Sequence, residues 1–549
     1  MSTEETPRTV DVAVIGAGAA GIYAMHKMTE LGFSAVGFER GSSVGGAWYW
    51  NRYPGLYCDI ESIDYSYSFS EELQQEWVWK RKYSTQPEIL SYFEWVADRL
   101  DVRKSFLFNT SVTDAVWSDE SQRWRVNTDT GVVLDARFII GATGPLSTPK
   151  IPEFEGAEGF KGEILATARW PREPQNFAGK RVAVIGTGSS GVQVIPVVAE
   201  QAEQLFVLQR TPSYAVPAHN HLLQQPHIDE VKSDYRGYRE RARQTPLGVF
   251  TGSSGKNASE VTVAERELEF QKAYDYGSTV KFGSSFNDLL MDPESNKAAA
   301  EFLANKIRSR VVDPAVAEKL IPSGYPILTR RLCSENNYYE AYNRPNVTLV
   351  DLFEEEIVRL TPEGIETTKG TYEVDVIILA TGFDAFTGAL RAINIVGREG
   401  RTLRGKWDES PSTYLGIAVS GFPNLFTVVG PLGGAGISNV VLNIEQHIEW
   451  IGDFLTTLRD QGATSFNADP DAEQDWVDKV AEVADATLFR YANSWYTGSN
   501  IEGKPRVVLQ WVGGVSEYER ILLECAKENY RGFHIVAADQ PEFVGAAAK

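Results

Sequence analysis

The chain has 549 residues, a formal net charge of −21 and 43% hydrophobic residues. At about 150 residues per domain, this length predicts roughly three domains, each large enough for a buried core. Nucleic acids and anionic membrane surfaces repel a chain with this charge, so we expect neither as a partner. The composition therefore favours a multidomain globular protein.

Three cysteines, Cys58, Cys333 and Cys525, are far apart in the sequence and predict neither a disulfide framework nor a zinc site. This cysteine usage favours a reducing, cytoplasmic compartment, and residues 1–8 are too short and polar for a signal peptide. Residues 410–444 contain no charged side chain. Because this stretch also holds six glycines, Pro423 and Pro431, it predicts a buried strand, a turn and a helix start rather than a membrane span.

Residues 9–21 contain the first chemical motif, an apolar strand followed by the spacing Gly-x-Gly-x-x-Gly. Gly16 allows a tight turn, and Gly18 lets backbone N–H groups approach a pyrophosphate at the start of the next helix. Gly21 lets that helix pack closely on the strand. A second strand ends on Glu39, whose carboxylate can bind both ribose hydroxyls of an adenosine. The combination predicts a binding site for FAD.

Residues 181–191 repeat the strand and the glycine spacing. The next strand ends differently, in Arg210 and Thr211 rather than in an acid. A carboxylate there would repel a 2′-phosphate, whereas an arginine and a hydroxyl would bind one by charge-assisted hydrogen bonds. The second unit therefore predicts a site for NADPH.

Two similar chain breaks, at residues 141–145 and 380–384, each follow a buried strand. Such a pair is expected where the chain crosses between two nested domains. The predicted fold class is α/β, with two nested Rossmann-like dinucleotide-binding domains and a helical insert. The predicted parts are 1–145 (FAD-binding domain, first part), 146–218 (NADP-binding domain, first part), 219–325 (helical insert), 326–384 (NADP-binding domain, second part) and 385–549 (FAD-binding domain, second part).

The insert at residues 219–325 is charged, and its pattern predicts helices, including one over 293–310. We expect the insert to form a lid or wall over the second dinucleotide unit. Its histidines, His219, His221 and His227, lack a regular helical spacing, which favours a solvated loop over a metal site.

Residues 45–69 are unusually aromatic and carry two acids, Asp59 and Glu61. A glycine pair at the start can line a cofactor closely, and Trp48 and Trp50 offer flat apolar surfaces. An aromatic core loop is the alternative interpretation. The acids need partners if they are buried, which favours a functional site.

Together with residues 160–171 and 494–506, these motifs resemble the flavin-dependent (type I) Baeyer–Villiger monooxygenases, and the likeness spans about residues 10–540. It is greatest for the phenylacetone, steroid and cyclohexanone monooxygenase branch. The resemblance implies tightly held FAD and exchangeable NADPH. It also implies insertion of one oxygen atom of O2 beside a ketone carbonyl, through a flavin peroxide, to give an ester or a lactone.

By matching position, the resemblance implies that Arg331 is the catalytic arginine and Asp59 its carboxylate partner. It assigns the 2′-phosphate to Arg210, Thr211 and Arg330. The other residues expected to bind the two cofactors are Gly16, Gly18, Ala20, Gly21, Glu39, Gly46, Ala47, Trp48, Trp50, Tyr65, Val112, Val440, Gly186, Thr187, Gly188, Ser189, Ser190, Gly191 and Trp495, with Asp59 also counted among them and Trp495 also at the substrate pocket. No metal is expected.

The chain departs from the family pattern at two places. Ala166 stands where the fingerprint Phe-x-Gly-x-x-x-His-x-x-x-Trp-Pro has its histidine, in a segment that links the two cofactor domains. Arg330 stands where a lysine is usual, preceded by Ile327-Leu328 in place of Phe-Gly. The first departure bears on the coupling of the domains and the second on phosphate contacts, because arginine forks where lysine is a point charge.

Three alternatives to a Baeyer–Villiger enzyme remain open. A flavoprotein disulfide reductase needs a redox cysteine pair, which the spacing of the cysteines does not supply. An N- or S-oxygenating flavin monooxygenase would use the same cofactors with another acceptor. An uncoupled NADPH oxidase is the third, favoured by Ala166. The expected partners are a small ketone and O2, and no sequence feature indicates which ketone or which oligomeric state.

Overall fold

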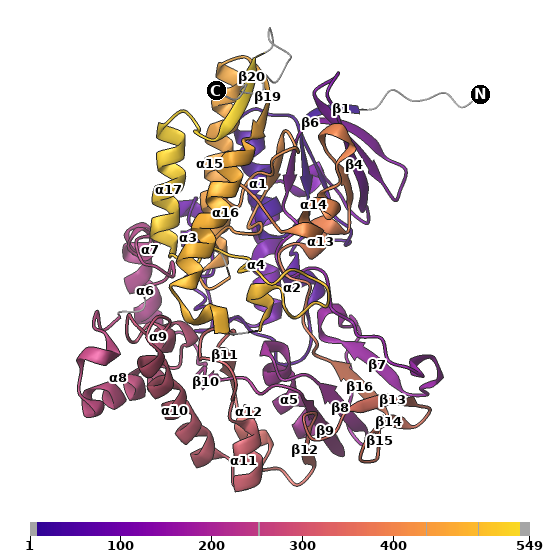
Figure 1. Ribbon diagram of the computed structural model, residues 1–549, viewed down its shortest axis with the longest axis vertical. Helices are drawn as coiled ribbons and strands as arrows, with labels where there is room; N and C mark the ends of the chain where they lie inside the picture. The colour runs from indigo at the N-terminus through magenta and orange to yellow at the C-terminus, as the bar shows by residue number, and fades with distance from the viewer. Residues whose placement is uncertain (1–7, 251–252, 435, 492, 538–549) are drawn as a thin grey trace.

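The structure is a computed structural model that describes residues 8–250, 253–434, 436–491 and 493–537. Two sheets of mainly parallel strands lie one above the other along the long axis of the molecule (Figure 1). Each sheet begins with a strand and helix that enclose one of the two glycine motifs. The predicted α/β class with two Rossmann-like units is confirmed.

The upper sheet has the strand order β17-β4-β5-β6-β1-β2-β3, with β18 also paired to β6. Strand β1 pairs in parallel with both β2 and β6, placing Val12 beside Ala35 and Phe138. Strands β4, β5 and β6 pair antiparallel to one another in sequence order. The strands are β1 (Arg8–Ile15), β2 (Ala35–Phe38), β3 (Phe106–Leu107), β4 (Val112–Ser118), β5 (Arg123–Thr128), β6 (Val133–Gly141), β17 (Asn394–Val396) and β18 (Leu425–Thr427).

Helices from both ends of the chain cover the upper sheet, and α1 packs against α15. A C-terminal pair of strands, β19 (Ala463–Ala468) and β20 (Phe533–Ala537), runs antiparallel beside α15. The helices of this half are α1 (Ala19–Glu30), α2 (Ala47–Trp50), α3 (Glu71–Glu76), α4 (Gln86–Arg99), α13 (Gly388–Arg391), α14 (Leu403–Glu409), α15 (Val440–Asp460), α16 (Pro470–Asp485) and α17 (Val515–Lys527). The upper half is thus built from two chain segments that are far apart in sequence.

The lower sheet is parallel throughout, with the order β12-β9-β8-β16-β7. Helix α5 follows β8, and a small antiparallel sheet of β13, β14 and β15 lies beyond. These elements are β7 (Glu163–Ala166), β8 (Arg181–Ile185), α5 (Ser189–Gln201), β9 (Gln204–Gln209), β12 (Val347–Asp351), β13 (Ile357–Thr361), β14 (Gly364–Thr367), β15 (Thr371–Glu373) and β16 (Val376–Leu379). The sheet receives strands from both sides of the insert.

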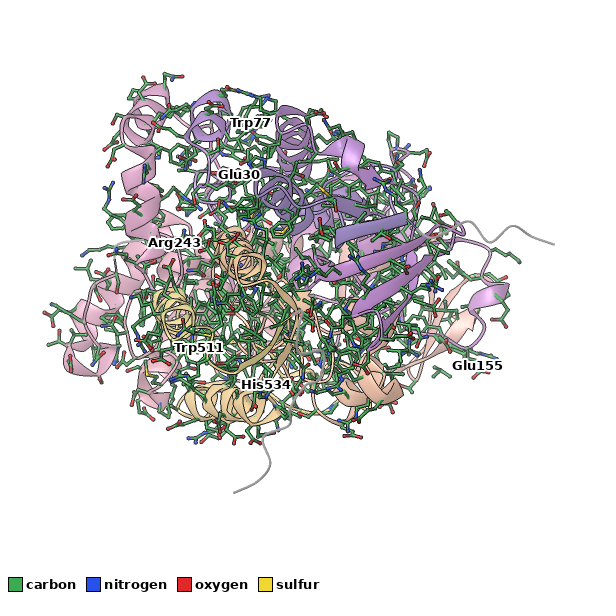
Figure 2. The ribbon with its side chains drawn as sticks, turned by 90° about the horizontal axis from the view of Figure 1, so that it is seen from above. Glu30, Trp77, Glu155, Arg243, Trp511 and His534 are labelled. Atoms are coloured by element: carbon green, nitrogen blue, oxygen red, sulfur yellow. The ribbon has the colours of Figure 1, made fainter. Side chains whose placement is uncertain are left out.

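The insert is helical, as its sequence predicts. Its helices are α6 (Gln225–Ser233), α7 (Tyr235–Arg243), α8 (Val263–Tyr276), α9 (Thr279–Gly283), α10 (Pro293–Arg310) and α11 (Pro314–Leu320), and it is flanked by the paired strands β10 (Ala215–Pro217) and β11 (Cys333–Glu335), after which comes α12 (Tyr338–Ala341). Helix α7 packs toward the upper half, and its end residue Arg243 is labelled in Figure 2. Arg243 pairs with Glu449 of α15 at 2.7 Å and with Glu519 of α17 at 2.5 Å. The insert therefore bridges the two halves.

The uncharged stretch 410–444 contains strand β18, a turn and the first turns of α15, as predicted. Most of its side chains are buried in the upper half. No helix within the described part of the chain is long and apolar enough to cross a membrane.

Candidate functional site

A cavity of about 1180 Å³ lies between the two sheets and receives residues from both glycine motifs. Arg331 lines it together with nearly all the residues that the sequence assigned to cofactors. These are Gly16, Gly18, Ala20, Glu39, Gly46, Ala47, Trp48, Trp50, Asp59, Tyr65, Val112, Val440, Gly186, Thr187, Gly188, Ser189, Ser190, Arg210, Thr211, Arg330 and Trp495. Gly21 and Gly191 are not in its wall.

The first glycine turn is shaped by contacts that leave no room for a side chain. Gly16 has φ +104°, and a Cβ there would lie 2.6 Å from the Ala142 oxygen. A Cβ on Gly21 would lie 1.8 Å from the Gly16 oxygen, so Gly21 acts in helix–strand packing rather than in the cavity wall. Gly46 approaches the turn from the other side, with its Cβ position 2.7 Å from the Gly18 Cα. The result is a narrow, backbone-lined groove at the N-terminus of α1, which fits a pyrophosphate.

Glu39 ends strand β2 at the edge of this groove and is 6% exposed. One carboxylate oxygen accepts the Ala17 N–H at 2.9 Å and the other accepts the Gly41 N–H at 2.7 Å. These bonds hold the carboxylate in place, and each oxygen keeps a lone pair for a further donor. The geometry fits the ribose of an adenosine nucleotide.

The second glycine turn has nearly the same backbone geometry as the first. Gly186 has φ +108° and its Cβ position lies 2.5 Å from the Ala380 oxygen. A Cβ on Gly191 would lie 2.1 Å from the Gly186 oxygen. Around Gly188, however, there is open space. This turn fits a second pyrophosphate, held in a more open groove.

Cationic side chains gather beyond the second turn. Arg210 is exposed, and Arg330 is half-buried with its guanidinium carbon 4.7 Å from the Tyr325 ring centre. The buried Nε of Arg330 has no hydrogen-bond partner. Burial lowers the pKa of Arg330, Tyr325 opposes this, and the positive charge of Arg210 lowers the pKa further. Like charges with a free donor are the arrangement that a phosphate dianion requires.

The sequence reasoning missed Lys150, which lines the same cavity and also feels the charge of Arg210. In the described part of the chain, Lys150, Arg210 and Arg330 have no carboxylate in an ion pair with them. The only feature of the sequence that could have indicated Lys150 was its position shortly after the chain break at 141–145. These three cations and the second glycine turn together fit the 2′-phosphate and pyrophosphate of NADPH.

Arg331 lies where the two halves meet and forms a two-pronged ion pair with Asp59. Its Nε donates to one carboxylate oxygen at 2.8 Å, and its Nη2 lies 2.7 Å from the other. Its Nη1 donates to the Gly436 oxygen at 3.2 Å. Burial alone would lower the pKa of Arg331, but Asp59 and Tyr496 outweigh it and raise the pKa above its ordinary value. Arg331 is therefore a fixed cation in the cavity wall.

Tyr496 is a second residue that the sequence reasoning missed. Its hydroxyl donates to the Gly436 oxygen at 3.2 Å, the same oxygen that accepts from Arg331. Its neighbour Trp495 stacks on Phe386 with the ring centres 5.8 Å apart. Asn500 of the same segment donates to the Phe383 oxygen at 2.8 Å, so the family-like segment at 494–506 reaches both the cation and the chain break at 380–384.

The aromatic stretch at 45–69 contributes cavity wall rather than core alone. The Trp48 indole donates to the Tyr65 hydroxyl at 3.0 Å, and the Arg40 guanidinium lies 4.7 Å from the Trp50 ring centre. Tyr53 donates to Gln193 of α5 at 3.0 Å, which joins the stretch to the lower half.

The insert covers part of the second unit, but its described residues do not line the cavity. None of the described residues at 219–250 and 253–325 is in the cavity wall. Ile307 of α10 and Leu320 of α11 share an apolar cluster with Val182 of β8, so these two helices pack against the second unit. Helix α7 packs against the upper half, and α8–α10 form an apolar cluster of their own. The sequence shows amphipathic helices, and it does not show which neighbour their apolar faces contact.

Among the described residues, no histidine lines the cavity, whereas Cys58 and Cys333 do. The histidines at 219, 221 and 227 are exposed, and the described residues contain no group that could hold a metal ion. All three cysteines are free and buried. Burial raises the pKa of the Cys333 thiol to about 11, so this cavity residue stays protonated. A reactive cysteine pair, which a disulfide reductase needs, is not formed by these residues.

Comparisons with known proteins agree with this geometry. A family model described as flavin-binding monooxygenase-like matches residues 9–221. The chain is 41% identical over 544 residues to the 2-oxo-Delta(3)-4,5,5-trimethylcyclopentenylacetyl-CoA monooxygenase of Pseudomonas putida, covering 97% of this chain and 100% of the relative. It is 40% identical over 537 residues to a Baeyer–Villiger monooxygenase of Pseudooceanicola batsensis, covering 96% and 97%. The structure of an oxidized steroid monooxygenase bound to NADP matches with a TM-score of 0.92 at 47% identity, covering 96% of this chain and 100% of that one.

Proposed function

This chain belongs to the flavin-dependent Baeyer–Villiger monooxygenases, and we propose that its reaction takes place in the cavity beside Arg331. It is an FAD-containing, NADPH-dependent enzyme that uses O2 to insert oxygen beside a ketone carbonyl, giving an ester or a lactone. The observation that carries the location is the two-pronged pair of Arg331 and Asp59 between the two glycine turns.

We assign the FAD to the groove of the first turn, with the pyrophosphate at Gly16 and Gly18 and the ribose at Glu39. We assign the NADPH to the second turn, with the 2′-phosphate at Arg210, Thr211 and Arg330. When bound, NADPH supplies a hydride and FAD supplies the activation of O2. The protein's own task is to hold the reacting groups in register and to exclude water.

Arg331 has a charge that the reaction can use. As the ketone is attacked, negative charge develops on its oxygen, and a preformed cation in a water-poor site stabilises that charge without reorganising. Asp59 holds the guanidinium plane with two bonds, which fixes the direction of the remaining N–H groups. Because the pKa of Arg331 is raised, the cation persists throughout the pH range in which a protein is folded.

The domain division at residues 145, 218, 325 and 384 is part of this proposal. Strand β7 is the first strand of segment 146–218, and β16 is the last strand of segment 326–384. Their parallel pairing in one sheet supports the assignment of both segments to one domain. A cytoplasmic location is proposed from the three free thiols, which a reducing compartment preserves. A small ketone and O2 are the proposed partners.

The test is ketone-dependent NADPH consumption by the purified yellow protein, with identification of the products. We expect an ester or lactone in proportion to the NADPH consumed. N-oxide or sulfoxide formation without ester from any ketone in a panel of linear, cyclic and aromatic ketones would favour an N- or S-oxygenating enzyme. Hydrogen peroxide as the only product would favour an NADPH oxidase.

A further inference from the structure

Lys150 lies at a junction of three chain segments, and its backbone is fixed there from both sides. Its N–H donates to the Gly382 oxygen at 2.8 Å, and its own carbonyl oxygen accepts the Thr381 hydroxyl at 2.5 Å. Its ammonium group donates to the Asn500 carbonyl oxygen at 2.5 Å. One of the three N–H donors of the ammonium group is thus committed, and two remain for the cavity that Lys150 lines.

The segment that carries Asn500 is attached to the same chain break. The Asn500 amide donates to the Phe383 oxygen at 2.8 Å. Lys504, whose side chain is 3% exposed, donates to the Asp384 carboxylate at 2.7 Å and pairs with it. Lys150 and Asn500 both line the cavity, and the bond between them joins the ammonium group to this segment. It therefore connects the docking of segment 493–506 to whatever occupies the cavity at that point.

The charges around Lys150 favour an anion. Burial lowers the pKa of Lys150, the neighbouring Arg210 lowers it further, and Glu502 opposes this from the segment side. Arg330 in turn feels the charge of Arg210. Three cations share one cavity wall and have no carboxylate partner among the described residues, so they repel one another until a multiply charged anion arrives.

We propose that Lys150 is a third ligand of the NADPH 2′-phosphate and that it couples phosphate binding to the docking of segment 493–506. The inference rests on the assignment of NADPH to the second glycine turn. With a phosphate bound, the ammonium group can donate to the phosphate and to the Asn500 oxygen together. NADH has no 2′-phosphate, so it leaves the repulsion among the three cations in place and gains nothing from Lys150.

The experiment uses the FAD-loaded full chain and two readouts that do not depend on turnover. The first is the Kd for NADP+ and for NAD+, measured by quenching of protein fluorescence. The second is hydrogen exchange of peptides within 493–506 at saturating NADP+ or NAD+. In the wild type we expect NADP+ to slow exchange in this segment more than NAD+ does.

Lys150→Met keeps the length of the side chain and removes the charge. We expect it to raise the Kd for NADP+ about tenfold, since a charge-assisted contact is lost, with little change for NAD+. At saturation, NADP+ and NAD+ should then protect segment 493–506 equally. Lys161→Ala is the matched control, because Lys161 lies in the same half, is exposed and pairs with Glu363 on the surface. It should leave both readouts unchanged.

The outcomes separate this inference from the proposed function. If Arg210→Ala weakens NADP+ selectively but Lys150→Met does not, the 2′-phosphate site stands and Lys150 is not part of it. If neither variant discriminates between NADP+ and NAD+, the assignment of NADPH to this turn fails as well. If Lys150→Met weakens NADP+ but the segment is still protected more by NADP+ than by NAD+, the coupling is overturned.

Discussion

The two glycine turns share one backbone geometry and differ in everything around it. Their first glycines have φ +104° and +108°, and both press against a carbonyl oxygen of a chain break. The first turn is closed by Gly46 and ends in the buried acid Glu39. The second is open around Gly188 and ends in the exposed Arg210. Backbone geometry thus provides for a pyrophosphate in both, while the surroundings decide which nucleotide binds and how easily it leaves.

We expect the largest effects from substitutions of the first glycine of each turn. A methyl group on Gly16 or Gly186 meets a backbone oxygen and forces a strained φ, which costs on the order of 1–3 kcal/mol before any contact with the cofactor is lost. We expect Gly16→Ala to lose FAD on gel filtration. Gly186→Ala should stay yellow but bind NADP+ too weakly to saturate. Gly131→Ala is the control, since Gly131 also has a positive φ but open space around it.

Loss of FAD from both turn variants, or from neither, would mean that the two turns do not serve separate cofactors. The ratio of FAD absorbance to protein absorbance measures this directly. A loss of FAD from Gly131→Ala would show that backbone strain alone is responsible.

The strand ends offer a smaller and more selective change. Arg210→Ala removes a charge-assisted phosphate contact worth about 1.5–3 kcal/mol, or roughly ten- to a hundredfold in affinity. We expect the apparent KM for NADPH to rise by that factor and the KM for NADH to change little. Initial rates with each nucleotide at a saturating ketone concentration measure both. Equal effects on the two nucleotides would remove the 2′-phosphate from Arg210.

We expect acid to lower the stability of the upper half through a buried histidine. The lower half has no such group, because none of the six histidines falls within residues 146–218 or 326–384. In α15 of the upper half, His447 is fully buried, accepts the Val429 N–H at 3.2 Å and contacts the Tyr518 hydroxyl at 2.8 Å. Burial lowers the pKa of His447 to about 4. The unfolded chain therefore binds more protons than the folded one between about pH 6.5 and 4, and stability falls as the pH falls through that window.

From that pKa we expect His447 to cost about 2 kcal/mol at pH 5 relative to pH 7.5. The measurement is the midpoint of thermal FAD release at the two pH values. His447→Gln should show a smaller drop in the midpoint than the wild type. An identical drop would mean that other groups control the acid sensitivity of the upper half.

The smallest effect is expected at Ala166, where the two halves are linked. Ala166 ends β7 beside Leu379 and does not line the cavity, although Ala168 does. Ala166→His should reduce the hydrogen peroxide released per NADPH without changing the ester, by less than about tenfold because no reacting group is touched. Peroxide and ester are measured in the same reaction. An unchanged ratio would show that the site is already packed around alanine.

The parts that the sequence predicted are those with local chemistry. A glycine turn, the strand before it and the acid or arginine after it lie within about 30 residues, and each carries its own physical requirement. Lys150 and Tyr496 were missed because their partners come from distant segments; Lys150 and Asn500 are 350 residues apart. The contacts of the insert with the upper half could not be predicted for the same reason. Helical periodicity gives the apolar face of α7 but not the acids of α15 and α17 that Arg243 meets.

Two adjacent arginines face different halves of the molecule. Arg330 belongs to the cations of the second turn, whereas Arg331 turns to Asp59 of the upper half. We propose that Arg331 serves oxygen insertion and that neither cofactor needs it for binding.

The most direct test of this role measures flavin reduction and ester formation separately in Arg331→Ala. Mixed with NADPH without O2, the variant should bleach its flavin at a rate within about tenfold of the wild type, because hydride transfer needs no cation at this position. With ketone and O2, ester formation should fall at least ~10²–10³-fold, the loss seen when one donor to a developing oxyanion is removed. The variant should still oxidise NADPH, and the O2 should be reduced to hydrogen peroxide. Asp59→Ala should lower ester formation less, since the charge remains and only its orientation is lost. A normal ester yield from Arg331→Ala would show that oxygen insertion does not need this cation.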